Sequence, residues 1–402
     1  MAFDGVTVAA ITDELQTKLA GGSIQKIAQP ETDELILTIK NNRVTYRLLL
    51  SASASLPLIH LTEQSKMSPL TAPNFCMVLR KHLSSARILS ISQPSLERIV
   101  EIQVEHLNEL GDLVRLKLIV ELMGKYSNII LVDSDDTIID SIKHVNGMIS
   151  SVREVLPGKT YFVPNTTNKT NPFDVTVDDW NQVILTKPTK VAKSIYSSLT
   201  GLSAVMSQEL AYRAGIDGDA DTASLNGNQR SSLMDQYRGF IHDLKQNRFH
   251  PVIYFENGFP KEFSATPLTI YDSLMHKEYD SISEVIETFY REKAVVSRIR
   301  QKSADLRKHV TMLIERCSKK ISIQTKQLND TEKKDKYKVY GELINTYGYQ
   351  LAPGSDKLTC LNYYTNEEIT IPLDITLSPT ENANKYFDKY NKMKRTYEAV
   401  SV

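Results

Sequence analysis

The sequence is poor in features that identify several common classes of protein. It has only three cysteines, Cys76, Cys317 and Cys360, and their number and wide spacing suit neither a disulfide framework nor a metal site. No apolar stretch approaches the roughly 20 residues that span a bilayer, and none near the N-terminus has secretory length. We therefore expect buried thiols in a reducing compartment, and a cytoplasmic protein that does not associate with membranes.

Sequence motifs of hydrolytic and phosphate-transfer enzymes are missing as well. The chain has no Gly-x-Ser-x-Gly elbow, no Gly-rich loop ending in Lys-Ser/Thr and no His-Glu-x-x-His. Its eight histidines are scattered, and neither His82 nor His106 has a set of cysteines or carboxylates beside it that would complete a metal site. We expect a protein that is not an enzyme and that uses no metal and no cofactor.

The chain as a whole has no net charge, since 48 lysines and arginines balance 48 acidic residues. Between Ile286 and Tyr340, however, 15 basic residues stand against 7 acidic ones, a surplus of +8 that leaves −8 for the rest. Such an uneven distribution is typical of a chain in which one segment meets a polyanion. We expect an electropositive arm on an otherwise acidic body.

What is present begins with a β-rich segment in a chain of 402 residues, which is long enough for several domains. Residues 1–172 predict a mostly antiparallel sheet with helices near 7–19 and 73–84, and a hairpin turn at Asn41-Asn42. We expect strands near residues 23–27, 34–40, 43–50, 86–93, 98–104, 113–122 and 128–132. The fold class is α+β.

In residues 173–248 the sequence pattern changes from that of strands to that of short helices. Gly201, Leu202 and Ser203 predict a tight turn between two helices. Such a unit either presents backbone N–H groups to a phosphate or only packs on the β domain. Strand patterns return at 251–255 and 261–265, and we expect them to rejoin the first sheet, so that the helical unit is an insertion.

A long helix is predicted from residue 282 to about residue 328, because apolar residues recur there at steps of three and four. This narrow apolar seam needs a partner helix. The seam consists of Val296, Ile299, Leu306, Val310, Leu313, Cys317, Ile321 and Leu328.

The partner helix is predicted to begin at Ser378, with Pro379 at its first position and Glu381 as the reciprocal cap. Residues 358–364 and 368–373 predict a β-hairpin at the tip of the resulting antiparallel arm. Since the second helix is still in pattern at residue 402, we expect the chain to be part of a longer protein.

A further tract, residues 121–131, places Gly124, Lys125, Ser127 and Asn128 between two apolar runs. Glycine accepts positive φ and the two polar residues bond readily to backbone, so the tract predicts a strand, a tight turn and a second strand. Lys125 is left as a charge on the turn.

Several tracts, in order along the chain, resemble those of the NFACT family. They are Met1–Gly5, Phe75–Leu83, Glu121–Leu131, Val155–Tyr161, Asn362–Tyr364, Ile371–Asp374, Glu381–Phe387 and Lys389–Lys392. The resemblance implies a glycosylase-like N-terminal domain in residues 1–172 and 249–283, a helix-hairpin-helix insert in 173–248, and a coiled-coil arm with a β tip in 284–402. It also implies that the family's C-terminal RNA-binding domain is absent.

The resemblance to glycosylases does not extend to their chemistry. Those enzymes use an N-terminal proline amine and a neighbouring glutamate, whereas this chain begins Met1-Ala2-Phe3. No secondary amine is available to form a Schiff base. What remains is a surface suited to nucleic acid without the reactive groups.

The resemblance assigns candidate tRNA contacts to Glu97 and Arg98, where the family usually has Asp-Arg. Arginine can form a bidentate fork on a phosphate, and the carboxylate can orient it or accept from a ribose hydroxyl. The alternative is an ordinary surface ion pair worth about 0–1 kcal/mol. Asp4 is a second candidate, and its alternative role is to cap the first helix.

Possible further RNA contacts are Arg80, Lys81 and His82 on one helix, and Lys125 on its turn. A solvated helix face and a structural turn residue are the alternatives. The resemblance implies a ribosome-associated quality-control factor that binds large ribosomal subunits, their rRNA and proteins, when these are obstructed by peptidyl-tRNA. It would recruit alanyl-tRNA for template-free alanine tailing. The alternative, from the family's older name, is a surface adhesin that binds fibronectin.

Overall fold

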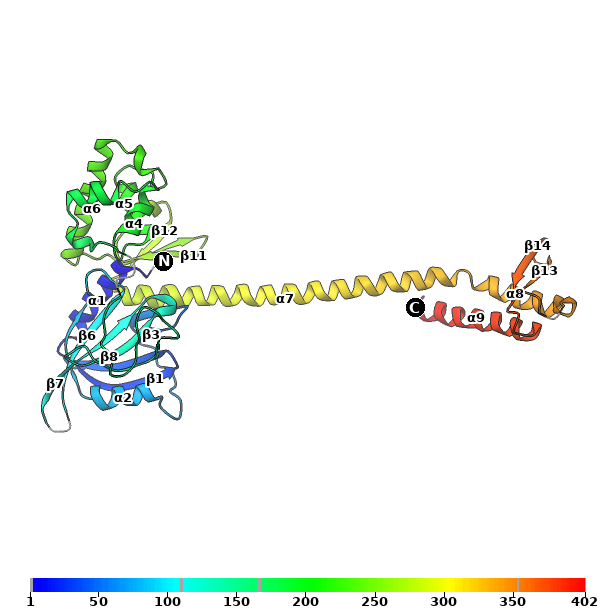
Figure 1. Cartoon of the computed structure of the whole chain (residues 1–402), viewed down its shortest axis with the longest axis horizontal. Helices are drawn as coiled ribbons and strands as arrows, with labels where there is room; N and C mark the ends of the chain where they lie inside the picture. Colours follow the sequence, from blue (N-terminus) through cyan, green and yellow to red (C-terminus); the bar gives the residue numbers. More distant parts are fainter. Residues whose placement is uncertain (1–2, 109–110, 165–167, 353, 402) are drawn as a thin grey trace. The chain divides into compact units, whose positions relative to one another are not determined.

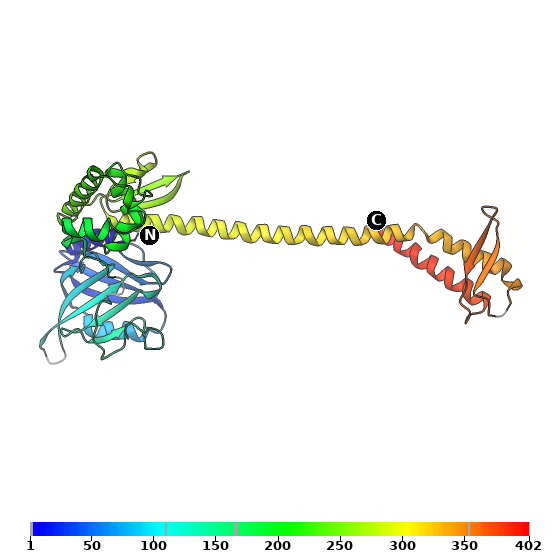
Figure 2. The same cartoon turned by 45° about the horizontal axis from the view of Figure 1, so that its top comes forward.

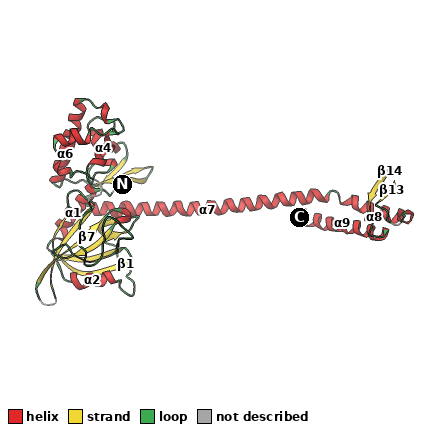
Figure 3. Ribbon diagram, viewed as in Figure 1, coloured by secondary structure: helices red, strands yellow, loops and turns green. Residues whose placement is uncertain are grey.

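The computed structural model describes residues 3–108, 111–164, 168–352 and 354–401, and within them the side chains of all but residues 183 and 294–305. The chain forms two compact units, Met1–Ser297 and Arg298–Val402, which are treated separately below (Figure 1). Helices and antiparallel strands both occur in quantity (Figure 3), which confirms the predicted α+β class.

The first unit is built on a nine-stranded antiparallel sheet with the order β4-β3-β2-β1-β5-β6-β7-β8-β9. Two helices, α1 (Gly5–Leu19) and α2 (Asn74–Leu83), pack against it. The strands are β1 (Ser23–Glu31), β2 (Glu34–Asn41), β3 (Val44–Ala52), β4 (Pro57–Leu61), β5 (Arg87–Ser92), β6 (Ile99–Leu107), β7 (Leu113–Glu121), β8 (Asn128–Val132) and β9 (Ile138–Ser141). The strands and helices predicted within residues 7–132 are confirmed, whereas β4 and β9 were not predicted.

The turns of this sheet follow the sequence closely. Asn42 and Arg43 have φ of 45° and 71°, as a two-residue hairpin turn requires, and they lie one residue after the predicted pair. The turn between β7 and β8 is a short 3₁₀ segment, Gly124–Tyr126, in which Gly124 has φ of 60°. Local turn chemistry therefore sets the register of both hairpins.

A helical insert follows the sheet. It contains α3 (Val177–Asp179), α4 (Val191–Ser198), α5 (Ala204–Arg213) and α6 (Gly227–Lys245). Its core holds Trp180, stacked on Tyr237 with ring centroids 4.6 Å apart. The predicted tight turn between two helices is present between α4 and α5, where Gly201 has φ of 75°.

The strands after the insert do not rejoin the first sheet, so that prediction was wrong. β10 (Val252–Glu256) pairs with β11 (Phe259–Ser264) on one edge and with β12 (Met275–Glu278) on the other, which gives a separate three-stranded sheet. Because β12 occupies the second edge of β10, that edge has no hydrogen-bonding groups left for the large sheet. β12 is exposed along its whole length and carries no apolar alternation that predicts it.

The insert and this small sheet are joined by one buried carboxylate. Glu209 of α5 accepts hydrogen bonds from Thr269 N, Thr269 Oγ1 and Ile270 N at 2.8–3.0 Å, and from Arg213 Nε at 2.5 Å. Its side chain is fully buried. Hydrogen-bond donors of the protein therefore stabilise the buried negative charge of Glu209 in place of water.

The long helix α7 (Ile282–Thr331) begins on the first unit. Glu14 of α1 accepts from Ser281 Oγ at 2.7 Å and from Ser283 N at 3.0 Å, which satisfies an N–H group at the start of α7. Leu61 N of β4 donates to Ser283 Oγ at 3.0 Å. The first turn of α7 is thereby tied to both α1 and the edge strand of the sheet.

In the second unit, α8 (Lys334–Tyr347) packs against α9 (Pro379–Val400), with a hairpin of β13 (Lys357–Asn362) and β14 (Glu367–Pro372) beside them (Figure 2). Ser378 and Glu381 form the predicted capping box, with Pro379 in the first turn. The hairpin and the start of α9 are therefore confirmed.

The partner of α9 differs from the prediction, which paired this helix with the long one. Tyr386 of α9 packs on Tyr337 and Tyr340 of α8, with ring centroids 6.0 and 5.4 Å apart. The helical conformation is interrupted between α7 and α8. Aromatic residues on α8 provide a wider apolar face for α9 than the α7 seam does. Seam residues that remain exposed are Leu306, Val310, Leu313, Cys317 and Ile321. The side chains of Val296 and Ile299 lie outside the described residues.

We predict that Glu209→Ala lowers the free energy of unfolding by about 3 kcal/mol, because it leaves buried donors and Arg213 without their acceptor. Trp180 is the only tryptophan of the chain and lies in the insert, so urea unfolding followed by its fluorescence reports this region. Glu256→Ala is the matched control, since Glu256 forms an exposed pair with Lys261 at 2.8 Å. Equal effects of the two variants would contradict the assigned role.

Candidate nucleic-acid interface

Three segments distant in sequence meet at the start of α1. Gly5 N donates to Gly201 O at 2.8 Å, and a Cβ on Gly5 would lie 2.1 Å from Leu96 O. A Cβ on Gly201 would lie 2.0 Å from the same oxygen. Gln93 Nε2 closes the arrangement by donating to Gly5 O at 2.9 Å and to Glu97 O at 2.6 Å. The backbones approach so closely that neither glycine can carry a side chain.

This contact bears on one of the two roles left open for the turn at residues 201–203, its packing on the β domain. The turn is packed on Leu96, its Gly201 O accepts from Gly5 N, and Ser203 Oγ caps α5 by accepting from Met206 N at 3.2 Å. The turn therefore packs on the sheet domain, and these bonds engage its acceptor groups. Phosphate binding by its backbone N–H groups stays a prediction.

Asp4 caps α1, as its alternative role required. Its Oδ1 accepts from Val6 N at 3.1 Å and from Thr7 N at 3.0 Å. Burial raises the pKa of this carboxyl, while hydrogen bonds from Ser203 and Thr7 oppose the shift. Asp4 and Glu262 line a cavity of only about 10 Å³, roughly the space of one water molecule. Asp4 thus positions the junction and has little room for a ligand.

Glu97 and Arg98 lie between Leu96, which makes this contact, and the first residue of β6. Both are half-buried, and Arg98 O accepts from Leu122 N at 2.8 Å, next to the turn that carries Lys125. Burial raises the pKa of Glu97, and the charges of Arg98 and Lys169 oppose the increase. The bonds of Gln93 to Gly5 and Glu97, and of Gly5 to Gly201, therefore bring Asp4, Glu97 and Arg98 to one junction. Figure 1 shows the start of α1 where the sheet domain meets the insert.

The sequence reasoning missed two cations at this junction. Lys169 Nζ donates to Tyr196 O at 2.8 Å, and Lys187 Nζ donates to Ser198 Oγ at 2.6 Å. Both acceptors lie in the last turn of α4. No motif surrounds either lysine, and only the folded chain places Lys169 near Glu97 and Arg98, and Lys187 near Lys169.

The turn with Lys125 rests on a buried ion pair. Glu121, at the end of β7, is fully buried and is bonded to Arg153 Nη2, and it accepts from Tyr161 Oη at 3.0 Å. Burial raises the pKa of Tyr161, and the carboxylate of Glu121 adds to the shift. Lys125 is exposed, with its ammonium 4.8 Å from the ring centroid of Tyr126.

The cluster on α2 lies elsewhere. Figures 1 and 2 both show α2 on the side of the sheet domain away from the insert. Arg80 Nε donates to Ile27 O of β1 at 3.1 Å, which gives this arginine a structural role. His82 contacts His106 edge-on at 6.2 Å between ring centroids, and Lys81 is exposed. The structure thus separates Arg80, Lys81 and His82 from the junction.

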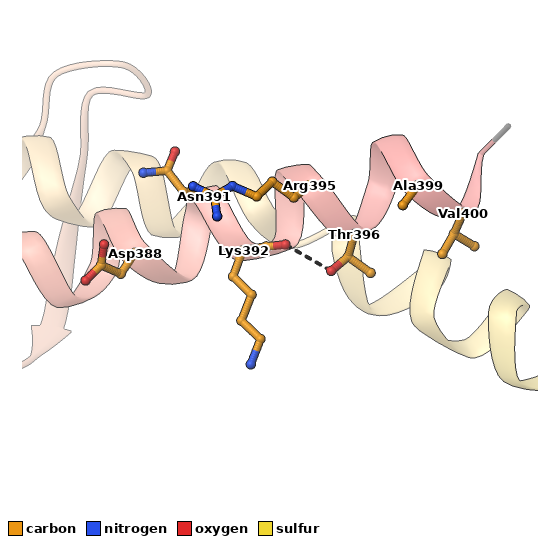
Figure 4. A pocket seen from close by; sticks show the side chains of 7 residues that line it. All are labelled: Asp388, Asn391, Lys392, Arg395, Thr396, Ala399 and Val400. Atoms are coloured by element: carbon orange, nitrogen blue, oxygen red, sulfur yellow. Dashed lines mark hydrogen bonds between the residues drawn. The ribbon is translucent and has the colours of Figure 1, made fainter.

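Within the described ranges, histidine, cysteine and acidic side chains nowhere gather in a group of three that could hold a metal ion. An open hollow of about 560 Å³ runs along α9, and the side chains that line it, among them Asp388, Lys392 and Arg395, all come from that helix (Figure 4). A hollow lined by one helix encloses too little of a ligand to define a site.

The same part of the chain contains no helix with the length and apolar character of a bilayer span.

These features define an α+β protein in which charged residues gather where an antiparallel sheet domain meets a helical insert. The family model for NFACT N-terminal and middle domains matches residues 4–402. The Rqc2 homolog RqcH of Bacillus subtilis (strain 168) is 34% identical over 403 residues, covering 100% of this chain and 68% of that protein. The chain therefore belongs to the NFACT family, and the predicted family is confirmed.

Solved structures agree with the assignment. The N-terminal part of the fibronectin/fibrinogen-binding protein from Streptococcus suis is 33% identical with a TM-score of 0.61, covering 72% of this chain and 99% of that one. The fibrinogen binding protein from Staphylococcus aureus is 28% identical with a TM-score of 0.62, with the same coverage of 72% and 99%. The sheet domain and its insert are thus a fold that has been solved in relatives.

We predict that Gly201→Ala destabilises the first unit far more than Gly215→Ala. Both glycines have positive φ, 75° and 71°, so each alanine carries a similar backbone strain of about 1–2 kcal/mol. Only at Gly201 would the added Cβ also collide with Leu96, since Gly215 has nothing within 4 Å. Urea unfolding of the two variants measures the difference, and equal losses of stability would contradict the close contact.

Proposed function

We propose that this protein is a ribosome-associated quality-control factor. It binds large ribosomal subunits obstructed by peptidyl-tRNA and recruits tRNA, specifically alanyl-tRNA, for template-free alanine tailing of the stalled chain. Membership of the NFACT family and 34% identity to an Rqc2 homologue over the full chain support this function. The observation that carries the tRNA site is the junction at which Glu97 and Arg98 lie, beside the start of α1 that Asp4 caps.

The proposed division of labour follows the predicted domains. Residues 1–172 and 249–283 form a glycosylase-like domain with two separate sheets, and residues 173–248 a helix-hairpin-helix insert. Residues 284–402 form an arm with a β tip, in which α9 pairs with α8. The domain and insert hold tRNA, and the basic arm meets rRNA and proteins of the large subunit. The surplus of +8 between Ile286 and Tyr340 supports an arm that is attracted to the phosphate groups of RNA.

The protein acts by positioning and not as an enzyme. Peptide bonds of the tail are made by the ribosome's own centre, and the protein contributes orientation of successive tRNAs. In this role Arg98 forks onto a phosphate while Glu97 orients it or accepts from a ribose hydroxyl. Lys125, on the turn beside Arg98, is a further contact of the same site. Arg80, Lys81 and His82 belong to a separate RNA-facing surface on α2.

We predict that Glu97→Ala/Arg98→Ala abolishes recovery of tRNA with the purified protein while the chain stays folded. The two side chains are half-buried, and the loop is held by backbone contacts that alanine retains. The measurement is sequencing and quantification of RNA that copurifies with the intact chain.

The matched control for this experiment is Glu105→Ala/Arg115→Ala. That pair, 3.2 Å apart, spans β6 and β7 at the other end of the same strands. It should leave tRNA recovery unchanged, because its charges lie away from the junction. Recovery of tRNA with the Glu97/Arg98 variant at the wild-type level would remove the site assignment.

A second function has one observation in its favour, namely the names of the two solved relatives, which are fibronectin/fibrinogen-binding and fibrinogen binding proteins. It would make the chain a surface adhesin for fibronectin. We propose a cytoplasmic protein instead and expect it to sediment with large ribosomal subunits when cells are fractionated. Recovery only in the cell-wall fraction, without tRNA, would support the adhesin.

A further inference from the structure

The last turn of α4 gathers two lysines from separate loops. Lys169 reaches the carbonyl of Tyr196 at 2.8 Å, and Lys187 reaches the hydroxyl of Ser198 at 2.6 Å. The end of a helix carries partial negative charge, which favours cations there. A carbonyl and a hydroxyl are neutral acceptors, however, so these two hydrogen bonds place no counter-charge beside either lysine.

Backbone bonds fix the segment with Lys169 to the junction, and Lys187 reaches the same end of α4 through its side chain. Thr170 N donates to Ser198 O at 2.8 Å, and Thr200 N donates to Thr170 O at 3.0 Å. The next residue along the chain, Gly201, makes the close contact with Gly5 and Leu96. The segment with Lys169, the end of α4 and the loop with Glu97 and Arg98 therefore form one continuous piece of structure.

The charges of this piece act on one another. Burial lowers the pKa of Lys169, the positive charges of Arg98 and Lys187 lower it further, and only Glu97 opposes them. All four side chains are half-buried. Three cations and one carboxylate leave a formal surplus of +2 in a small area, in a chain whose overall charge is zero. A group of this kind is stabilised by an anion.

We propose that Lys169 and Lys187, together with Arg98, bind consecutive phosphates of the RNA backbone where the sheet domain meets the helical insert. The inference rests on the proposed function and adds two residues to its site. Arg98 supplies a planar fork for one phosphate and the lysines supply compact charges for its neighbours. In the alternative, both lysines serve only to cap α4.

The test measures binding of purified tRNA to the full chain over a range of salt concentrations. Each phosphate contact contributes about 0.7–0.9 to the slope of log affinity against log salt. Lys169→Gln/Lys187→Gln should therefore weaken binding at low salt and reduce the slope by about 1.5. Lys169→Arg/Lys187→Arg keeps both charges and should retain the slope.

The matched control is Lys190→Gln/Lys193→Gln, which removes two lysines from the other end of the same helix. Lys190 is engaged with Asp219 at 2.7 Å, and Lys193 is exposed. This variant should bind tRNA with the wild-type slope. Fluorescence of Trp180 in the insert shows whether each variant keeps its fold, so that a loss of binding is not mistaken for unfolding.

A pH profile separates binding from capping even if the glutamine variant unfolds. Because its pKa is lowered, Lys169 loses its proton at a lower pH than an ordinary lysine, and tRNA affinity should fall as pH rises through that range. Arginine stays charged throughout, so Lys169→Arg should remove the early fall. The neighbouring groups Glu97, Arg98 and Lys187 are unchanged in this comparison.

The outcomes distinguish the two proposals. If the folded Lys169→Gln/Lys187→Gln variant binds tRNA as tightly as the wild type and with the same salt slope, the lysine contacts are overturned. The proposed function would still stand. Likewise, an identical pH profile for wild type and Lys169→Arg would overturn the role of Lys169. Absence of tRNA binding by the wild-type chain at low salt would instead remove the proposed function.

Discussion

The structure of the first unit depends on one close contact between backbones. Gly5, Leu96 and Gly201 come from segments far apart in sequence, and they approach so closely that a single methyl group on either glycine would collide with Leu96 O. Charged residues flank this contact on two of the three segments, Asp4 beside Gly5 and Glu97 with Arg98 beside Leu96. Packing that has nothing to do with charge therefore determines which charged groups become neighbours.

Local features of this fold could be predicted from sequence because the forces that set them act over a few residues. The start of α9 follows from Ser378 and Glu381, and the hairpin of β2 and β3 follows from Asn42. The separate sheet around β10 could not be predicted, since the choice between two possible strand partners depends on groups distant in sequence. The same holds for α9, whose partner is decided by the aromatic face of α8.

In the candidate site, too, some residues could be predicted from sequence and others could not. Glu97 and Arg98 were nominated by resemblance, and Asp4 could be read both as a cap and as a contact. The structure shows the cap directly. Lys169 and Lys187 had no signal in the sequence, because their relation to Arg98 exists only through the bonds between Thr170, Ser198 and Thr200.

In the proposed function, two kinds of positive charge contribute differently to recognition of RNA. Exposed lysines of α7, such as Lys319 and Lys320, act through solvent and lose influence beyond about 8 Å at physiological salt. They favour encounter with any polyanion. The lysines at the end of α4 are half-buried and held by hydrogen bonds, so their position is fixed before a ligand arrives. Fixed charges favour only a phosphate spacing that matches them. Under the proposed function, selectivity for one RNA shape therefore arises at the junction rather than on the arm.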